Sequence, residues 1–228
     1  MRILKPRPAA TAANSDASRA AAPTAPTRPA PVPTASTWPG RELLDDPITA
    51  QVLLSVWNGD PAVLVPSPPG AGKTRLVVLL SAALAHRAGL RVGIAAQTRA
   101  QAVDIARRLG AVAEPRLIGL LWKKSGVRPD TGGCPLVFGG SGWPRCGGGV
   151  RVATTAKWLR CEPDEAAADV LIVDEAYQAT YADVGALGAM ARQIVCVGDP
   201  GQIDPVVTGD VSRWAGSATG PHRPAPLA

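Results

Sequence analysis

The sequence predicts an α/β protein in which one parallel sheet is covered by helices on both faces. Short apolar runs of four to six residues alternate along the chain with longer stretches of helical character. The runs are apolar throughout, which is typical of strands that are buried on both faces. The first run leads into a glycine-rich loop and then into a helical stretch. Together these observations indicate a parallel sheet with crossover helices.

Each of the first four expected strands is followed by an expected helix, as parallel strands require. The expected strands are Ala62–Val65, Arg91–Ala96, Val150–Ala153, Val170–Val173 and Ile194–Val197. The expected helices are Thr74–Ala88, Arg99–Leu109, Thr155–Leu159 and one near Tyr181–Arg192.

Three segments fall outside this pattern. Residues 1–40 consist mostly of Ala, Pro, Thr and Ser, and they bury too little apolar area to fold, so we expect a disordered tail. Residues 131–149 hold eight glycines, which predicts an irregular, mobile loop. Residues 41–212 are therefore expected to form the folded domain. Residues 213–228 are expected to be a flexible tail or the start of a further domain.

The net charge of +6 comes from the two ends of the chain. Residues 1–40 carry five basic residues and one acid, and residues 213–228 carry two basic residues and no acid. These segments contribute +4 and +2, so the remainder sums to zero. The bulk charge therefore says little about what the folded part binds.

The composition indicates neither a membrane span nor a strong metal site. No apolar run approaches the roughly 20 residues of a membrane helix, and no apolar stretch follows the basic N-terminus as in a secretory signal. A cytoplasmic protein without a membrane partner is expected. The four cysteines lie far apart, which favours reduced structural thiols. A metal site from Cys134, Cys146 and Cys161 is the weaker alternative.

A phosphate-binding loop is predicted between the first expected strand and its helix. The segment reads Ser-Pro-Pro-Gly-Ala-Gly-Lys-Thr, a Walker A loop in which Ser67 replaces the usual first glycine. Backbone N–H groups of the loop would point at the phosphates of ATP. Lys73 would reach the β- and γ-phosphates, and the Thr74 hydroxyl would bind Mg²⁺. The expected nucleotide contacts are Ser67, Pro68, Pro69, Gly70, Ala71, Gly72, Lys73 and Thr74.

Two adjacent acids, Asp174 and Glu175, follow the apolar run Val170–Val173. Ligands of open α/β sheets lie beyond the carboxyl ends of the strands, so these acids should lie near the phosphate loop. We expect Asp174 to hold Mg²⁺ and Glu175 to orient and deprotonate the attacking water. An acidic helix start favoured by the helix dipole is the alternative, but it explains only one of the two acids.

Three segments resemble the motifs of superfamily 1 helicases, most closely those of the Upf-like branch. Pro68–Thr74 resembles motif I, and Asp174–Gln178, which reads Asp-Glu-Ala-Tyr-Gln, resembles motif II. Val197–Val207 contains the Gly-Asp-x-x-Gln run of motif III. The resemblance covers about residues 41–210 and implies a RecA-like fold. It also implies an ATP hydrolase that uses Mg²⁺ and acts on single-stranded DNA or RNA.

The resemblance also implies roles for single residues. Gln202 would sense the γ-phosphate, with Asp199 and Gln178 supporting that network. Gln51 lies before the loop, where the family has a glutamine that recognises adenine. The nucleic-acid contacts implied by the family's motifs are Gln97, Thr98 and Thr155.

The chain departs from this family in one large respect. Superfamily 1 helicases use a second RecA-like domain whose arginines stabilise the transferred phosphoryl group, an effect worth about 10³–10⁵ in rate. The sequence stops soon after motif III. We therefore expect either a fragment of a longer helicase or a partner protein that supplies the second domain. Negligible turnover is expected from these residues alone.

Basic residues gather between Arg99 and Arg128, where they exceed acids by five. The run Leu121-Trp122-Lys123-Lys124 places an aromatic ring among cations, as surfaces that bind single strands do. Lys123 and Lys124 are therefore expected nucleic-acid contacts. A solvated helix face with Trp122 anchored in the core is an equally supported interpretation.

Two other functions remain open from the sequence. One is a different P-loop ATPase, PhoH-like or AAA-type, although the run from Gly198 to Pro205 argues against the AAA type. The other is a module that binds nucleotide and changes shape without hydrolysing it. Nucleotide affinity without turnover, even with a nucleic-acid strand present, would favour that module.

Overall fold

The computed structural model describes residues 37–123, 127–131, 137–139, 143 and 147–228. Within this part of the chain seven strands form one sheet, and every pair of neighbouring strands is parallel. The spatial order of the strands is β1-β7-β6-β2-β5-β3-β4. Their bounds are β1 Ala62–Pro66, β2 Arg91–Ala96, β3 Ile118–Leu121, β4 Val137–Gly139, β5 Gly149–Thr154, β6 Ala168–Asp174 and β7 Ala191–Gly198.

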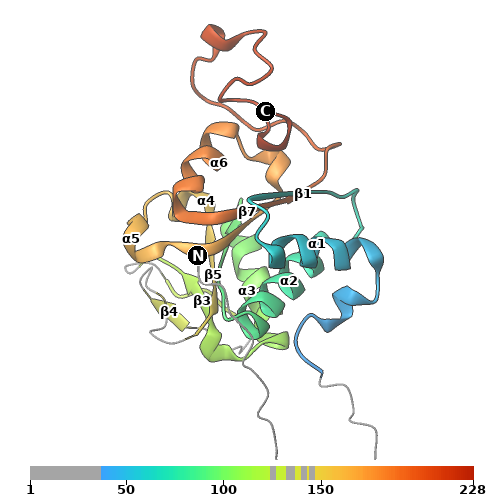
Figure 1. The fold of residues 1–228 in the computed structure, drawn as a ribbon. Coiled ribbons are helices and arrows are strands. Elements are labelled where there is room, and N and C mark those ends of the chain that lie inside the picture. The colour runs from blue at the N-terminus through green and yellow to red at the C-terminus, as the bar shows by residue number, and fades with distance from the viewer. Residues whose placement is uncertain (1–36, 124–126, 132–136, 140–142, 144–146) are drawn as a thin grey trace, which may run out of the picture. The chain divides into compact units, whose positions relative to one another are not determined.

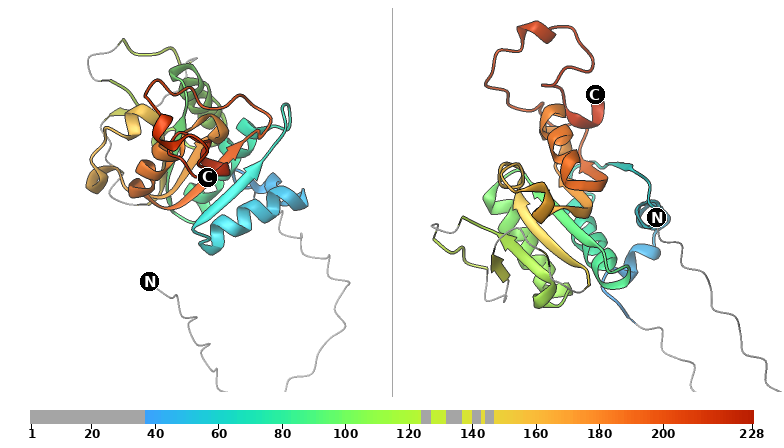
Figure 2. Two further views of the ribbon diagram at one scale, coloured as in Figure 1. Left: turned by 90° about the horizontal axis from the view of Figure 1, so that it is seen from above. Right: turned by 60° about the vertical axis from the view of Figure 1, so that its left-hand side comes forward.

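Helices cover both faces of this sheet (Figures 1 and 2). One face carries α1 (Pro47–Asn58), α2 (Lys73–Arg87) and α3 (Arg99–Val112). The other carries α4 (Thr155–Trp158), α5 (Pro163–Ala166) and α6 (Tyr181–Leu187). The predicted fold class, a parallel α/β sheet with helices on both faces, is confirmed.

Successive residues of the central strands enter two separate hydrophobic cores. In β6, Ile172 packs into the core under α1 to α3, whereas its neighbours Leu171 and Val173 pack into the core under α4 to α6. All three side chains are fully buried. Side chains alternate between the faces of a strand, so a strand buried on both faces is apolar at most positions. This explains why the central strands could be found in the sequence as continuous apolar runs.

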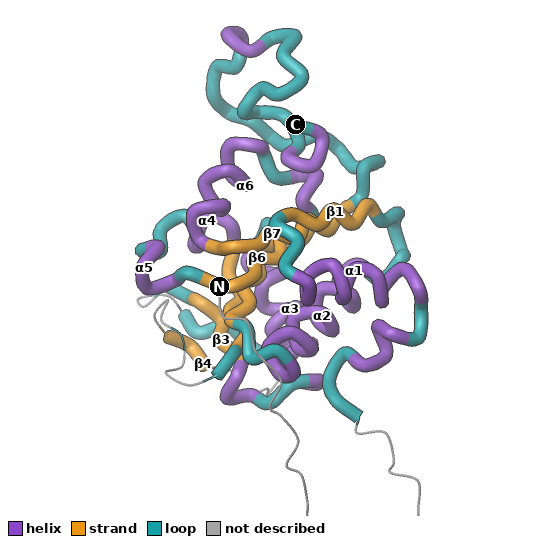
Figure 3. Tube along the Cα trace, in the orientation of Figure 1, coloured by secondary structure: helices purple, strands orange, loops and turns teal. Residues whose placement is uncertain are grey.

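The structure adds elements that the sequence did not indicate and shortens one that it did. Strands β3 and β4 and helix α1 were not expected. The helix expected near Tyr181–Arg192 ends at Leu187, and a 3-10 turn, Gly188–Met190, follows it. Ala191 already begins β7, where it pairs with Ala168 of β6. The sequence alone suggested a longer helix, but the last residues of that stretch pair as a strand instead (Figure 3).

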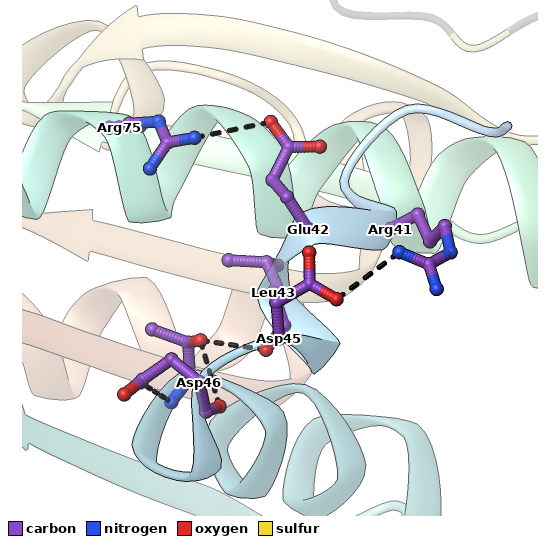
Figure 4. A network of polar contacts seen from close by, with 7 residues as sticks. Arg41, Glu42, Leu43, Asp45, Asp46 and Arg75 are labelled. Atoms are coloured by element: carbon purple, nitrogen blue, oxygen red, sulfur yellow. Dashed lines mark hydrogen bonds and ion pairs between the residues drawn. The ribbon is translucent and has the colours of Figure 1, made fainter.

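The start of α1 is fixed by polar contacts shown in Figure 4. The Asp46 carboxylate accepts a hydrogen bond of 2.9 Å from the Thr49 backbone N–H, and the Thr49 hydroxyl donates to the Leu43 carbonyl at 2.7 Å. Arg75, in the first turn of α2, donates to Glu42 at 3.4 Å. The Arg75–Glu42 pair is largely exposed, so we assign it little stability. Together these contacts connect α1 to the helix that follows the phosphate loop.

The segment after β7 leaves the sheet and then returns to α6 (Figure 1). Tyr181 N–H donates to the Arg223 carbonyl at 2.8 Å, and Ala225 N–H donates to the Ala179 carbonyl at 3.0 Å. Between these ends, Ile203 and Val206 are 75% and 86% exposed. Residues 213–228, expected to be a tail or the start of another domain, here carry backbone hydrogen bonds to the turn before α6 and to its first residue.

Candidate nucleotide site

The predicted phosphate loop connects β1 to α2 at the carboxyl edge of the sheet. Gly70 and Gly72 have φ of +76° and +83°, a left-handed backbone that glycine adopts without strain. A Cβ added to either glycine would meet no heavy atom within 4 Å. Gly72 is also the N-cap of α2, so the free N–H groups of that helix begin at the loop. The loop therefore offers open space beside backbone donors, which fits a phosphate group.

Asp174 ends β6 and is 4% exposed. Burial, reinforced by repulsion from Glu175, raises the pKa of its carboxyl to about 6, while the Lys73 ammonium opposes that rise. Its Oδ1 is buried without a hydrogen-bond partner among the described residues. A buried carboxylate oxygen with no partner is costly, and a bound cation would remove that cost. The donor chemistry at Asp174 and Thr74 therefore fits Mg²⁺, which prefers oxygen ligands.

Glu175 turns the chain sharply at the end of β6. Its φ of 54° and ψ of 44° place it in the left-handed region, and no other non-glycine residue in the described part of the chain has a positive φ. This conformation costs a non-glycine residue about 1 kcal/mol or more, and such strained residues gather at functional sites. Its Oε2 is buried and lacks a partner among the residues described. The turn thus holds the Glu175 carboxylate beside Asp174.

Strand β7 lies between β1 and β6, so its carboxyl end lies between the phosphate loop and the acid pair. Asp199 follows it, is 5% exposed, and accepts a hydrogen bond of 2.8 Å from Gly201 N–H. Gln202 N–H donates to the Asp199 carbonyl at 3.2 Å. The Gln202 Oε1 is buried, and it too has no partner in the described structure. The sequence-predicted residues of motifs I, II and III therefore meet at three adjacent strand ends.

Two glutamines, Gln51 and Gln178, were also predicted to contact the nucleotide or support its site. Gln51 is exposed on α1. Gln178 closes the 3-10 turn Ala176–Gln178 and is half-buried, and its backbone N–H donates to the Glu175 carbonyl at 2.9 Å. The roles predicted for these two glutamines stay predictions.

The predicted nucleic-acid contacts lie further along the same edge, after β2, β5 and β3. Thr98 is the N-cap of α3 and shares a capping box with Gln101, so its hydroxyl already serves the helix. Thr155 is buried, and its hydroxyl donates to the Ala96 carbonyl at 3.5 Å. Lys123 is exposed, and Lys124 lies outside the described residues. Both threonine hydroxyls therefore already make hydrogen bonds within the fold, which argues against their direct contact with a nucleic-acid strand.

The basic stretch between Arg99 and Arg128 begins on α3, which carries Arg99, Arg107 and Arg108. Trp122 packs against the core under α1 to α3, as the helix-face interpretation expected. Trp122 follows β3, is half-buried, and donates its indole N–H to the Val127 carbonyl at 3.0 Å. Several cations of the stretch have partners elsewhere: Arg108 with Asp104, Arg116 with Glu114, and Arg107 with the Asp130 carbonyl.

A cavity of about 730 Å³ opens beside Trp122. Two of its cations, Lys157 and Arg160, were not singled out in the sequence. They reach the cavity because β5 pairs with β2, a long-range contact that no local pattern encodes. The lining residues are Gln97, Arg99, Ala102, Leu121, Trp122, Lys123, Val127, Thr154, Ala156, Lys157 and Arg160.

Two of the four cysteines lie in the described part of the chain. Cys161 and Cys196 carry free thiols, and burial raises the pKa of Cys196 to about 11. Cys134 and Cys146 lie outside the described residues. The part of the chain with described coordinates contains no cluster of three or more His, Cys, Asp or Glu side chains suited to a metal ion. None of its helices is long and apolar enough to cross a membrane.

Comparison with known proteins supports the fold. A family model described as an AAA domain matches residues 145–223, about a third of the chain. No curated protein matches. The DNA-bound, nuclease-deleted type ISP restriction-modification enzyme LlaGI is similar at a TM-score of 0.52 and 15% identity, over 73% of this chain and 18% of that one.

Two helicase structures are similar at lower scores. The Hef helicase domain of Pyrococcus furiosus has a TM-score of 0.47 and 18% identity, over 78% of this chain and 36% of that one. The UvsW helicase of bacteriophage T4 has a TM-score of 0.46 and 14% identity, over 64% and 50%. The chain thus spans half or less of the length of each structure. The likeness to LlaGI agrees with the parallel α/β fold described above, and the AAA-domain match covers residues 145–223.

Proposed function

We propose that residues 41–212 form the ATP-binding domain of a motor that acts on nucleic acid. The observation that carries the proposal is a set of three buried oxygens without partners among the described residues: Asp174 Oδ1, Glu175 Oε2 and Gln202 Oε1. They belong to the ends of β6 and β7, next to the phosphate loop. Buried polar atoms are nearly always paired in folded proteins, so three together indicate a missing ligand. Mg²⁺ and the waters of its shell would satisfy these three acceptor oxygens.

Each residue of the site has its own role in this proposal. Lys73 and the loop N–H groups hold the phosphates, and Thr74 and Asp174 hold Mg²⁺, which neutralises charge on the phosphates when bound. Glu175 orients the attacking water and accepts its proton. Gln202 contacts the γ-phosphate, supported by Asp199 and Gln178. Gln51 contacts the adenine.

We further propose that efficient hydrolysis requires a second RecA-like domain, in a longer chain or in a partner protein. The loop residues Pro68, Gly70 and Gly72 are exposed, so one side of a bound triphosphate would face solvent. An arginine that closes this side is worth about 10³–10⁵ in rate. Rapid hydrolysis by residues 1–228 alone that Lys73→Ala abolishes would contradict this requirement.

A different ATPase of the AAA type is the second candidate. The AAA-domain match extends across the run from Gly198 to Pro205, the run that in the sequence alone spoke against an AAA-type ATPase. The two candidates differ in their response to nucleic acid. A motor of the helicase type should bind single-stranded DNA or RNA and bind ATP more tightly when the strand is present.

The test of the proposed function is a titration of the purified protein with a fluorescent ATP analogue, with and without Mg²⁺ and an oligonucleotide. The proposal predicts Mg²⁺-dependent binding that Lys73→Ala abolishes. Binding of the strand without any linkage to nucleotide would favour the AAA-type alternative. Linked binding without hydrolysis, even after a second domain is added, would favour a nucleotide-dependent switch module.

A further inference from the structure

The C-terminal part of the chain returns to α6 and docks beside the motif II turn (Figure 1). We call residues 219–227 the strap, and residues 179–182, which join that turn to α6, the docking surface. Three backbone hydrogen bonds connect them: Tyr181 N–H to the Arg223 carbonyl at 2.8 Å, Ala182 N–H to the Pro221 carbonyl at 3.0 Å, and Ala225 N–H to the Ala179 carbonyl at 3.0 Å. An antiparallel bridge pairs Thr180 with Pro224. The surface thus receives the strap as a sheet edge receives a short added strand.

Burial of two small side chains adds to these hydrogen bonds. Pro224 is buried, and Ala225 packs against the core under α4 to α6. Arg223 and Leu227, in contrast, are exposed. Among the described residues, the backbone hydrogen bonds of residues 203–218, which tether the strap to β7, join only members of that loop. The strap is therefore held by its own contacts with the docking surface.

The sequence of the strap recurs near the start of the chain. Residues 219–227 read Thr-Gly-Pro-His-Arg-Pro-Ala-Pro-Leu, and residues 24–32 read Thr-Ala-Pro-Thr-Arg-Pro-Ala-Pro-Val. Six of the nine positions are identical, and Leu227 corresponds to another aliphatic residue, Val32. Residues 24–32 lie outside the described part of the chain, so the comparison with the strap is one of sequence.

The identical positions are those that make the docking contacts. The residues that supply the two accepting carbonyls, the buried proline, and the donating N–H group all have identical counterparts, which are Pro26, Arg28, Pro29 and Ala30. The position with the largest chemical difference is His222, which corresponds to Thr27. Its Nδ1 has no hydrogen-bond partner in the described structure. The repeat therefore keeps the groups on which docking depends.

Two of the differing positions change together. A Cβ at Gly220 would lie 2.6 Å from His222 Cε1, so an alanine does not fit beside that histidine. The repeat has Ala25 in place of Gly220 and Thr27 in place of His222. The ring that would exclude the extra methyl group is thus absent where the methyl group is present. A tail rich in Pro and Ala accounts for single matches but not for this compensation.

We propose that the docking surface of one copy of this chain also binds residues 24–32 of a second copy. The segment takes the place of the strap and repeats its three backbone hydrogen bonds to residues 179–182. Each chain carries one such surface and two segments that fit it, so one segment per chain is left for another copy. The interaction requires no nucleotide and is separate from the proposed function.

The tether gives the strap an advantage over a segment from another copy. A flexible tether holds its segment at an effective concentration on the order of 1 mM, and a second copy must compete with that. Association is therefore weak in the unaltered protein and becomes strong once the strap is released. Exchange of equivalent segments between copies is a low-cost route to a dimer.

Fluorescence anisotropy of a labelled synthetic peptide with the sequence of residues 22–34 measures binding to the whole chain. Ala225→Asp releases the strap by placing a charge against the core, so this variant should bind the peptide roughly tenfold more tightly than the unaltered protein. A peptide that carries Ala30→Asp should bind neither protein. Equal affinity of the two proteins for the original peptide would overturn the proposal.

Gly220→Ala releases the strap in a second way, through the close approach of its Cβ to His222. It too should bind the peptide more tightly than the unaltered protein. Addition of His222→Thr copies the pair found in residues 24–32, so it should restore the strap and weaken peptide binding again. Tight peptide binding that persists in the double variant would contradict the equivalence of the two segments.

Tyr181→Pro, made in the Ala225→Asp protein, tests the docking surface itself. Residue 181 is the first of α6, where proline is favoured, and Thr180 before it is extended, with φ of −73° and ψ of 154°. The change removes one donor and leaves the helix intact, so the peptide should bind roughly fivefold more weakly. Tyr181→Ala keeps the N–H group and is the matched control. Unchanged affinity in Tyr181→Pro would show that the peptide binds elsewhere and would overturn the proposal.

Sedimentation velocity decides whether the segment comes from a second copy. The Ala225→Asp protein should dimerise at concentrations near the Kd of the peptide. Addition of Ala30→Asp should return it to a monomer, whereas Ala21→Asp, an equal charge outside the repeat, should leave the dimer intact. A protein that binds the peptide but stays monomeric well above that Kd would contradict association between copies.

Discussion

The Ser67 backbone N–H donates a hydrogen bond of 2.8 Å to the Gly198 carbonyl. This bond extends the pairing of β1 with β7 beyond the last paired residues, Pro66 and Gly198. It fixes the first residue of the phosphate loop to the strand end that leads into Gln202. One stretch of backbone thus sets the position of the phosphate loop and that of Gln202, the residue expected to sense the γ-phosphate.

Gly198→Ala should disturb this junction. A Cβ at Gly198 would lie 2.8 Å from Tyr177 Cδ2 and 3.0 Å from Ala176 N, so β7 and the motif II turn would have to separate. We expect a loss of about 1–3 kcal/mol in the free energy of unfolding, measured by urea denaturation, together with weaker nucleotide binding. Gly185→Ala in α6 is the control, because its Cβ would meet nothing within 4 Å and alanine favours a helix. Equal stability of the two variants would argue against the close packing.

Asp174→Asn should stabilise the metal-free protein, but only at the higher pH values. The buried carboxyl keeps its proton up to about pH 6, whereas an unfolded aspartate loses it near pH 4. The folded state therefore binds more protons in this window, and the free energy of unfolding falls as pH rises from about 4 to 6, by about 3 kcal/mol. The asparagine variant avoids that loss.

Thermal unfolding of both proteins at pH 4 and pH 7.5 measures the effect. The variant should gain in Tm at pH 7.5 and show little difference at pH 4. Saturating Mg²⁺ and ATP analogue should stabilise the unaltered protein more than the variant, since the variant lacks the carboxylate for the cation. A gain in Tm that is the same at both pH values would show that the carboxyl titrates normally.

Glu175→Gln should separate nucleotide binding from hydrolysis. The amide keeps the size of the side chain but accepts no proton, so any slow residual hydrolysis should fall by about 10²-fold or more. Affinity for the ATP analogue should change little. Radiolabelled ATP at enzyme excess measures the rate, with Lys73→Ala as the variant that loses binding itself. An unchanged rate in Glu175→Gln would remove this residue from the chemistry.

Trp158→Phe should destabilise the fold. The change removes the indole donor from the Ile94 carbonyl in a fully buried site, which costs about 1–3 kcal/mol in the free energy of unfolding. Trp143→Phe removes a longer, half-buried bond of 3.2 Å to Ala166 and should have the smaller effect on stability. Urea denaturation of both variants measures the difference. Equal stability of the two variants would show that the buried indole bond contributes little.

The sheet was predictable where a strand is buried on both faces. β2 was predicted with its observed bounds, Arg91–Ala96, and β6 to within two residues at either end, because both strands contain a continuous run of buried apolar residues. β3 was missed since Ile118–Leu121 is only four residues long and follows a proline-started turn instead of a helix. Its membership of the sheet depends on pairing with β5, which is distant in sequence.

The nucleotide site was predictable because its residues lie close together within short motifs. The loop reads as one contiguous segment, and Asp174 and Glu175 are adjacent at a strand end. The left-handed backbone of Glu175 could not be predicted, because no local sequence pattern marks a strained glutamate. The cavity could not be predicted either, because Lys157 and Arg160 come to line it together with Arg99 only through the pairing of β2 with β5.

Isothermal titration with a slowly hydrolysed ATP analogue tests the central claim most directly. The account predicts Mg²⁺-dependent binding at one site by the unaltered protein, no detectable binding by Lys73→Ala, and binding without Mg²⁺ dependence or none by Asp174→Asn. Absence of binding by the unaltered protein, or equal binding by the unaltered protein and Lys73→Ala, would contradict it.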